Sequence, residues 1–560
     1  MMSNREISRL FSLYAELLLL HQKNERLAAL LSGAAYRLRN ILENVLHLNK
    51  EELSKLFKPE IISIIEELKK IQTIEALDEL IQLTPQGLFE MMRIKGLGGK
   101  KLSALWTTAK IDSIDSLLIA CKNGTVSKLP GFGIKTQENI LKAIENYRSG
   151  EDHFHYASVA DAANALIQAL QILHKSELIS LCGEIRRQST TVKGIEIITA
   201  LSSKQFNKVS LRKLLSVQSS DNNQTIAHTL DEIPVTIYHT TAKQFYYELF
   251  NRTGNEAHVK KVLKNLNNKH AYNSEEAIYK AAGLPFIVPE MREDVAEWNL
   301  KNNDDLIKFE DIKGVVHNHT TWSDGVATLK DFVFACKKRR YEYVVISDHS
   351  KNAHYAGGLK EEKVLRQMKE IDKVNKELAP FKILKSIECD IRVSGDLDYE
   401  NDFLKLFDLV IISVHQLLKM NEEKATSRLI KAIENPYTTI LGHMTGRQLL
   451  IRPGYPVNFK KVIDACSANN VIIEVNANPY RLDMDWSQIP YALSKGVMIS
   501  VNPDAHSIGE IDNMRWGVSA ARKGGLTKDM TWNAMPLNKI ESWLRKKQKF
   551  RNTVLNKISS

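Results

Sequence analysis

From about residue 314 onward, the sequence repeats one pattern in which a short, fully apolar run is followed by a helical segment. The apolar runs include YVVIS, FDLVIISV, TTILG, VIIEVN and VMISV. Continuous apolar runs of this length are typical of strands that are buried on both faces, as in a parallel sheet covered by helices. The pattern therefore predicts an α/β domain over residues 310–560 with a largely parallel sheet.

Side chains that can bind metal ions stand at the ends of these runs. His317 and His319 follow the run Gly314-Val315-Val316, and Asp504 and His506 follow VMISV. Because residues i and i+2 of a strand point to the same face, each pair is expected to ligate one site together. Further candidates stand after other runs, namely Asp348, His349, Glu388, His415 and His443. The carboxyl ends of barrel strands are where active sites of α/β barrels are built.

Mixed histidine and carboxylate ligands suit zinc, manganese or iron better than magnesium, which prefers oxygen ligands alone. Several such ions in one site favour phosphoester hydrolysis, because they polarise a phosphoryl oxygen and generate hydroxide near neutral pH. The sequence has no GxSxG motif and no recognisable Cys-His spacing, which argues against a covalent nucleophile. Asp348 fits a ligand or a carboxylate that orients a ligand histidine, and Asp390 fits support for the strand that carries Glu388.

The first 150 residues have helical periodicity and contain a repeated glycine motif. The segments IKGLGGK (94–100) and LPGFGIK (129–135) share the pattern apolar-x-Gly-apolar-Gly-x-Lys and start 35 residues apart. Glycines in such a turn expose amide groups at a helix N-terminus, which bind a phosphate oxygen whatever the base sequence. The alternative is an ordinary turn between helices.

The charge balance favours the first of these interpretations. The formal net charge is +11, with a pI of about 9.1, and a basic chain attracts polyanions. We therefore expect helix-hairpin-helix motifs that bind the DNA backbone without sequence preference. The predicted contacts are Lys95, Gly96, Gly98, Lys100, Lys101, Gly131, Gly133 and Lys135.

Composition also indicates the cellular compartment in which the protein is expected. No stretch approaches the roughly 18 apolar residues that a membrane span needs, and the N-terminus lacks the apolar segment of a secretion signal. Five cysteines are widely scattered without a CxxC pair, which fits reduced thiols in a cytosol. We expect a cytoplasmic, nucleoid-associated protein without a membrane partner, and a monomer is favoured.

The second half of the chain resembles the PHP (polymerase and histidinol phosphatase) domain. The resemblance runs through HNHTTWSDG, SDHS, IECDI, SVHQ, GHMTGR, EVNANPYRLD and DAHS. It implies a distorted α/β barrel that holds two or three divalent ions, with Mn²⁺ favoured and Zn²⁺ or Fe²⁺ as alternatives. The implied ligands, which are also the catalytic residues, are His317, His319, Asp324, His349, Glu388, His415, His443, Asp504 and His506.

The order of the upstream segments resembles the bacterial family X DNA polymerases. The resemblance implies a multidomain chain with a helical N-terminal region, an α+β nucleotidyltransferase-like palm and thumb, and the PHP domain. The expected boundaries are 1–85 (helical domain), 86–150 (helix-hairpin-helix, fingers-like), 151–235 (palm-like), 236–300 (thumb-like) and 310–560 (PHP).

The palm-like segment departs from the family at its active-site positions. Family X palms carry Gly-Ser before two arginines, then Gly-Asp-x-Asp and a third Asp on a later strand. Here Glu184 replaces the serine, and Gly194, Glu196 and Thr236 replace the three aspartates. Because two-metal nucleotidyl transfer needs several carboxylates, this polymerase site is predicted to be degenerate. The alternative is a slipped alignment, in which Asp231 or Glu232 takes over.

These features predict a metal-dependent phosphodiesterase that acts on DNA. The resemblance implies a 3′–5′ exonuclease, or an enzyme that processes DNA ends or abasic sites in repair, with a polymerase half reduced to DNA binding. Three alternatives are a weak gap-filling polymerase with exonuclease activity, a small-molecule phosphatase like the histidinol phosphatases, and a DNA-binding protein with a structural metal site.

Overall fold

The structure is a computed structural model, and it divides into two compact units, Met1–Asp152 and His153–Ser560. It describes all residues except 1, 3, 39–40, 42, 72, 93, 95, 151–152, 208–213, 265, 267–270, 301 and 560. Lys95, a predicted DNA contact, therefore lies outside the described residues. In the described part of the chain, no helix has the length and apolarity to cross a membrane.

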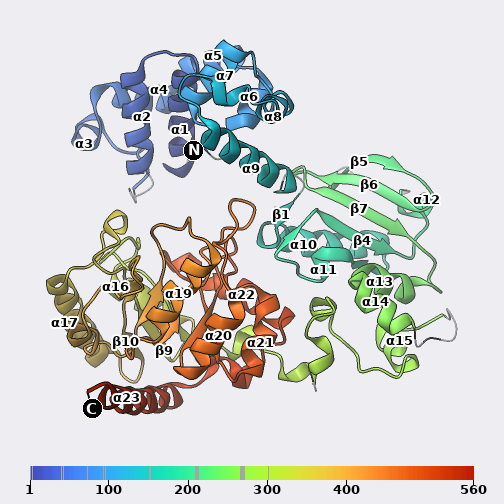
Figure 1. The fold of residues 1–560 in the computed structure, drawn as a ribbon. Coiled ribbons are helices and arrows are strands. Elements are labelled where there is room, and N and C mark those ends of the chain that lie inside the picture. The colour runs from blue at the N-terminus through green and yellow to red at the C-terminus, as the bar shows by residue number, and fades with distance from the viewer. Residues whose placement is uncertain are drawn as a thin grey trace. The chain divides into compact units, whose positions relative to one another are not determined.

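The first unit is helical, as the periodicity predicts (Figure 1). Residues at three- and four-residue spacing, such as Ile7, Phe11 and Leu18 of the first helix, are buried in one core with the helices that follow. The helices are α1 (Asn4–Leu20), α2 (Glu25–Leu38), α3 (Lys50–Leu56), α4 (Pro59–Ile71), α5 (Glu75–Leu83), α6 (Gln86–Met92), α7 (Gly99–Ala109), α8 (Ile114–Lys122) and α9 (Ile134–Gly150), with the 3₁₀ turn η1 (Val126–Lys128).

The second unit begins with a five-stranded sheet of order β2-β4-β7-β6-β5, in which β4 and β7 are parallel and the other neighbours antiparallel. Strand β7 runs through the predicted palm–thumb boundary at 235/236. The elements are β1 (Phe154–His155), α10 (Tyr156–His174), β2 (Ile179–Leu181), α11 (Gly183–Arg186), β3 (Thr191–Val192), β4 (Ile195–Thr199), α12 (Ser203–Phe206), β5 (Leu215–Ser220), β6 (Gln224–Thr229), β7 (Pro234–His239), α13 (Phe245–Thr253), α14 (Glu256–Leu263) and α15 (Glu275–Ala281).

The C-terminal part contains two parallel sheets, β10-β9-β8 and β11-β12-β13-β14-β15. Parallel bridges Asn318–Ala505 and His349–Glu388 join the sheets at both sides, so that the strands form a closed ring. The strands are β8 (Gly314–Val315), β9 (Tyr343–Ile346), β10 (Lys382–Lys385), β11 (Glu388–Asp390), β12 (Ile411–Ser413), β13 (Ile440–Leu441), β14 (Ile472–Asn476) and β15 (Ile499–Asn502).

Helices surround this ring of strands (Figure 1). They are α16 (Leu329–Lys338), α17 (Glu361–Leu378), α18 (Asn401–Leu404), α19 (Glu422–Ile433), α20 (Phe459–Ala468), α21 (Ile489–Ser494), α22 (Met514–Lys523) and α23 (Leu537–Ser559). The predicted multidomain α/β architecture is thus confirmed.

The two faces of the ring strands have different packing partners. Ile412 and Ile473 pack into the large core shared with the helices, whereas their neighbours Ile411 and Ile472 belong to a second apolar cluster with Trp532. This alternation follows from the two-residue period of a strand. It makes the strands apolar on both faces, as the sequence predicts.

A buried ionic contact joins the segments around Arg187 and Glu290–Glu293 to α22 of the C-terminal part. Lys523, at the end of α22, is 1% exposed and donates hydrogen bonds to the Arg187 carbonyl at 2.8 Å and to the Glu293 carboxylate at 2.6 Å. Arg522 pairs with Glu290 at 2.6 Å. Buried charges of this kind hold two surfaces in one register because misplacing them leaves an unpaired charge.

Replacing Lys523 by alanine is expected to lower the free energy of unfolding by about 3 kcal/mol, because it breaks a buried ion pair. Urea denaturation measures the change. Lys528→Ala is the matched control, since the Lys528 ammonium pairs with Asp311 at 2.7 Å but is 56% exposed; its cost should stay below about 1 kcal/mol. Equal losses in the two variants would contradict the structural role of Lys523.

Candidate metal centre

The structure brings all nine predicted ligands into one cluster at the carboxyl ends of the ring strands. Their nitrogen and oxygen atoms form four overlapping groups, and the atoms of each group lie within 4.8 Å of one another. The groups are His319, Asp324, His349 and His506; His317, His443 and Asp504; His317, His319 and Glu388; and His349, Glu388 and His415.

The Glu388 carboxylate is the centre of this cluster. It is fully buried, and it lies 2.8 Å from His349 Nδ1, 3.0 Å from His443 Nε2, and 3.2 Å from the Nε2 atoms of His317 and His415. A carboxylate with two oxygens among four imidazoles can bridge neighbouring metal ions. The arrangement therefore suits a multinuclear site.

Several buried nitrogen and oxygen atoms in the cluster have no hydrogen-bond partner among the described residues. An unsatisfied buried polar atom costs about 1–3 kcal/mol, so a concentration of them in one place needs an explanation. His349 Nδ1 and Glu388 Oε2 face each other at 2.8 Å without hydrogen-bond geometry. The atoms are His317 Nε2, His319 Nδ1, His349 Nδ1, Glu388 Oε2 and His443 Nδ1. Divalent cations would satisfy them, so the residues fit a metal centre.

Charge balance within the cluster supports the same conclusion. Burial disfavours the ionised carboxylates, but the surrounding histidines hold the pKa values of Glu388 and Asp504 well below their usual range. Burial lowers the pKa values of His317 and His415, but nearby carboxylates outweigh this effect. The pKa of His317 is therefore raised, and that of His415 rises to about 10. Burial and two neighbouring histidines lower the pKa of His319 to about 3. Protons on the histidines thus balance the carboxylate charges, and bound divalent cations would take over this role from those protons.

Two further carboxylates hold ligand histidines in place. The Glu474 carboxylate lies 2.6 Å from His317 Nδ1, and the Asp390 carboxylate lies 2.5 Å from His415 Nδ1. Such partners fix the orientation and basicity of a ligand imidazole. Sequence reasoning missed Glu474, although it stands two residues after the inward-facing Ile472 in a strand that is otherwise apolar or neutral.

Asp348 and Asp390 have other roles than the simplest ones expected from sequence. Asp348 is fully buried and accepts hydrogen bonds from the Thr320 amide at 2.8 Å, the Ser323 hydroxyl at 2.6 Å and the Gln367 amide at 2.5 Å. It therefore shapes the loop that follows His319. Asp390 does more than support its strand, because it contacts His415 directly.

Strand alternation, from which the sequence predicts the pairs His317/His319 and Asp504/His506, is wrong here, although the residues do cluster. Strand β8 ends at Val315, and His317 and Asp504 have left-handed backbone conformations, with φ of +64° and +51°. Alternation therefore does not apply across them. His317 and His319 still share a group with Glu388, but Asp504 and His506 fall in different groups. Such φ values in non-glycine residues cost of order 1–3 kcal/mol and concentrate at functional sites.

Strands β4 and β7 carry a single carboxylate at the predicted polymerase positions. Glu196 on β4 pairs in register with Thr236 on β7. A Cβ added to Gly194 would lie 2.5 Å from the Pro234 carbonyl oxygen, so no side chain fits there. The alternative residues, Asp231 and Glu232, lie in the exposed turn between β6 and β7.

The two glycine hairpins differ in their surroundings. In the first, the Gly99 amide donates to the Glu16 carboxylate at 2.5 Å, and the Lys100 ammonium pairs with Glu25 at 2.8 Å. A Cβ added to Gly99 would lie 2.3 Å from the Glu16 carbonyl oxygen, so α7 begins in close contact with α1. The Lys101 ammonium donates to the Gly96 carbonyl at 2.9 Å.

The second hairpin is open. Gly131 and Gly133 have no atom within 4 Å of an added Cβ, and the side chain of Lys135 is exposed. Both glycines are exposed within the Met1–Asp152 unit, so amides of this turn can reach a ligand phosphate. Two motifs with the same sequence pattern therefore have different surroundings in the structure.

The chain is similar to a known protein over most of its length. It is 32% identical over 500 residues to the DNA polymerase/3′–5′ exonuclease PolX of Bacillus subtilis (strain 168), a match that covers 85% of this chain and 87% of that protein. The chain belongs to the PolX family. This confirms the resemblance to the family X polymerases with a PHP domain. No family model matches the sequence.

Shorter matches to phosphatases agree with this PolX membership. A probable phosphatase of Thermoanaerobacter sp. (strain X514) is 27% identical over 250 residues, which is 42% of this chain and 94% of that protein. A probable phosphatase of Shewanella piezotolerans is 26% identical over 212 residues, or 35% of this chain and 80% of that protein. The expectation of a hydrolytic enzyme is thereby confirmed.

Replacing Glu474 by glutamine is expected to weaken Mn²⁺ binding by roughly 10–100-fold, the range typical for a residue that orients a ligand histidine. The amide can still accept from His317, but it lacks the charge that raises the basicity of the imidazole. Calorimetric titration with Mn²⁺ measures the affinity. Glu362→Gln, at an exposed position on α17, is the control. Unchanged affinity in Glu474→Gln would contradict this assignment.

Proposed function

We propose that this PolX-family chain is a metal-dependent phosphoesterase that acts on DNA, either as a 3′–5′ exonuclease or on damaged ends and abasic sites. The observation that carries the proposal is the buried cluster of nine ligands around Glu388. The name of the Bacillus subtilis relative, which includes a 3′–5′ exonuclease activity, supports the same reaction. Mn²⁺ is the proposed metal, with Zn²⁺ or Fe²⁺ as alternatives.

The cluster is open on one side. The side chains of His506 and Asp324 are 35% and 32% exposed, whereas the other seven ligands are at most 9% exposed. A scissile phosphate therefore enters past His506 and Asp324. When bound, divalent ions polarise a phosphoryl oxygen and provide hydroxide near neutral pH. Tyr355 is 61% exposed, and its ring centroid lies 6.1 Å from that of His349, where it offers a stacking face for a terminal base.

We propose that the palm-like part does not synthesise DNA. Glu196 alone cannot hold two magnesium ions, and its carboxylate already accepts hydrogen bonds from the Glu184 amide and the Tyr238 hydroxyl, both at 3.3 Å. The two arginines of the motif are also committed: Arg186 pairs with Glu275 at 2.5 Å, and Arg187 pairs with Glu293 at 3.0 Å. Nucleotide binding would have to break these buried pairs.

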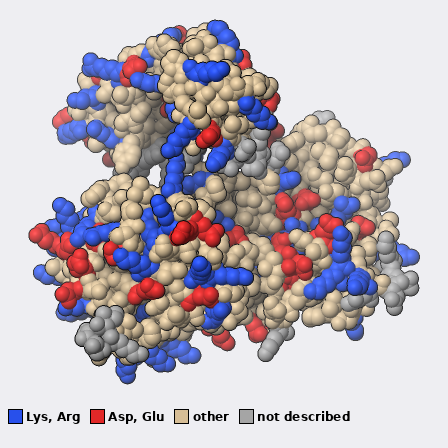
Figure 2. Space-filling view, viewed as in Figure 1, with Lys and Arg blue, Asp and Glu red and all other residues tan. Residues whose placement is uncertain are grey.

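The proposal also includes the assignment of the individual domains and motifs. The closed ring of parallel strands supports a PHP-type barrel over 310–560, and the five-stranded sheet supports a palm-like domain. The hairpins near Gly98 and Gly131 are assigned to helix-hairpin-helix motifs of the helical N-terminal region. Lys and Arg side chains are spread over the viewed surface of that unit, as expected of a partner for a polyanion (Figure 2).

A primer labelled at its 5′ end and annealed to a template tests the reaction directly. With Mn²⁺ the primer should shorten, and added nucleotides should not extend it. His319→Ala and Asp504→Ala should each reduce hydrolysis by more than the roughly 10–100-fold typical of residues that only orient a ligand. Asp396→Ala, at an exposed site of the same domain, should retain activity.

Each outcome of this assay has a separate meaning. Extension that depends on the template would contradict the degenerate palm. Full hydrolysis by both ligand variants would contradict the metal centre. Turnover of a small phosphate ester without turnover of DNA would favour a small-molecule phosphatase, the second candidate, which the similarity to the probable phosphatases supports.

The two hairpins should contribute unequally to DNA binding. Lys135→Glu should weaken binding to duplex DNA and flatten the log–log salt dependence by about 0.9 for each phosphate that the variant no longer neutralises. Lys100→Glu should have a smaller effect, because Lys100 is already paired with Glu25 and the Gly99 amide with Glu16. Fluorescence anisotropy at several salt concentrations measures both.

Hydrolysis of a small chromogenic phosphodiester is the control for these two variants, and it should be unchanged in both. Equally weakened DNA binding in the two variants would mean that both hairpins bind DNA. Unchanged affinity in both would mean that DNA binds elsewhere on the chain.

A further inference from the structure

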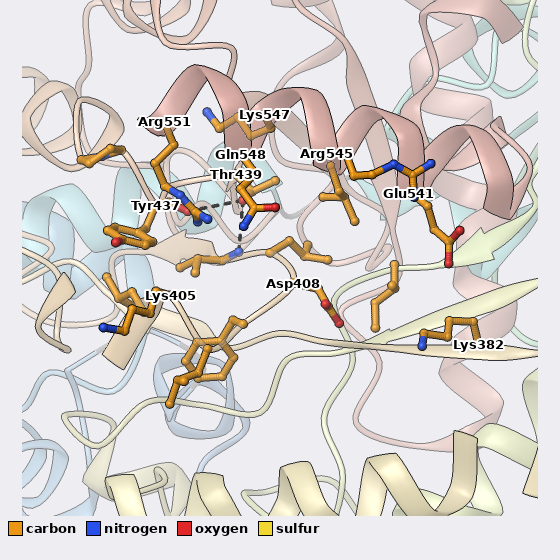
Figure 3. Close-up of a pocket in the computed structure, with 18 residues that line it drawn as sticks. Lys382, Lys405, Asp408, Tyr437, Thr439, Glu541, Arg545, Lys547, Gln548 and Arg551 are labelled. Atoms are coloured by element: carbon orange, nitrogen blue, oxygen red, sulfur yellow. Dashed lines mark hydrogen bonds between the residues drawn. The ribbon is translucent and has the colours of Figure 1, made fainter. Parts of the chain in front are cut away.

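A cavity of about 350 Å³ lies at the end of the ring strands opposite the metal cluster. It opens between helix α23 and the segments that lead into β10, β12 and β13 (Figure 3). Lys382 is the first residue of β10, and Val410 and Thr439 directly precede β12 and β13. The metal ligands follow the carboxyl ends of the same strands, so the cavity is a separate site.

Positive charge dominates the lining. Five lysines and arginines line the cavity, against the two carboxylates of Asp408 and Glu541. This excess of formal positive charge attracts an anion. The five cationic residues are Lys382, Lys405, Arg545, Lys547 and Arg551.

Two of these cations are partly buried without a carboxylate partner in the described part of the chain. The Lys547 ammonium donates to the carbonyl oxygens of Asn469 and Asn470 at 2.6 and 3.1 Å, and the Arg551 guanidinium lies over the ring of Tyr437, 4.6 Å from its centroid. Burial, reinforced by the nearby Arg551 charge, lowers the pKa of Lys547 to about 8. A bound anion would compensate both charges.

The remaining lining argues for an organic anion and against a bare phosphate. The lining includes the apolar side chains of Leu384, Phe407 and Leu409, and Figure 3 shows Arg551 and Tyr437 at the end opposite Glu541 and Lys382. Inorganic phosphate would leave most of the volume and all of the apolar surface unused. A volume of about 350 Å³ falls in the range of small-molecule sites.

We infer that this cavity binds a nucleoside monophosphate. The phosphate would lie at the end formed by Arg551, Lys547 and Lys405, where guanidinium and ammonium groups provide charge-assisted hydrogen bonds. The sugar and base would cover the apolar floor, and their hydroxyl and amino groups would donate toward Asp408 and Glu541. The inference goes beyond the proposed hydrolysis and does not depend on it.

Calorimetric titration of the full-length His319→Ala chain, with a chelator present, tests the cavity without interference from the metal centre. Deoxyadenosine 5′-monophosphate should bind with a Kd below about 1 mM. Deoxyadenosine and inorganic phosphate should each bind at least tenfold more weakly than that nucleotide. Arg551→Gln and Lys405→Gln should each weaken binding by about tenfold or more, the loss expected for one charge-assisted hydrogen bond.

Lys549→Gln is the matched control, because Lys549 is exposed on the same helix but does not line the cavity. Its affinity should equal that of the parent chain. If Arg551→Gln does not fold, Lys405→Gln, on a different segment, carries the test. Equally weakened binding in Lys549→Gln, equal affinity for inorganic phosphate, or no binding would overturn the inference. Tighter competition by single-stranded DNA would also overturn it, because the surface would then serve nucleic acid.

Discussion

The arrangement of the C-terminal half of the molecule depends on the buried carboxylate of Glu388. A single ionised carboxylate in a protein interior is costly unless opposite charge or metal ions surround it. Four imidazole nitrogens lie within 3.2 Å of it, and each comes from the end of a different strand. These strands can meet around one side chain because bridges at both edges close them into a ring. The closed ring of strands is therefore what brings the four histidines around Glu388.

The interior of that ring changes from apolar to polar along the strands. At the amino ends, inward positions such as Ile411, Ile440 and Ile472 are apolar, and Trp532 packs against them. Two residues further along β14, the inward position is Glu474, which holds His317. The apolar half supplies packing energy through burial. It also closes the amino end of the ring to water, so that the cluster is exposed only at His506 and Asp324.

Sequence reasoning succeeded where a residue type and its place in a pattern sufficed. The apolar runs and the residues after them predicted the parallel strands and eight of the nine clustered residues, because strand ends meet whatever the details of the loops. The ninth, Asp324, was expected only from the resemblance to the PHP domain, and Asp348, which the pattern also suggested, lies outside the groups. It failed where an outcome depends on one contact between distant segments. Neither the Glu16 carboxylate at Gly99 nor the partnership of Glu474 with His317 has a local signal. The left-handed φ of His317 also has no signal in the sequence, because histidine seldom adopts this conformation.

The two arginines of the family X motif are held in ion pairs in this structure. Arg186 and Arg187 occupy the motif positions that resemble a nucleotide site, yet their charges are paired with Glu275 and Glu293. Glu293 in turn accepts from Lys523, the last residue of α22. Arg187, one of the two arginines, is thus linked through Glu293 to Lys523 of the C-terminal part. Such a network is stable because its buried charges have partners.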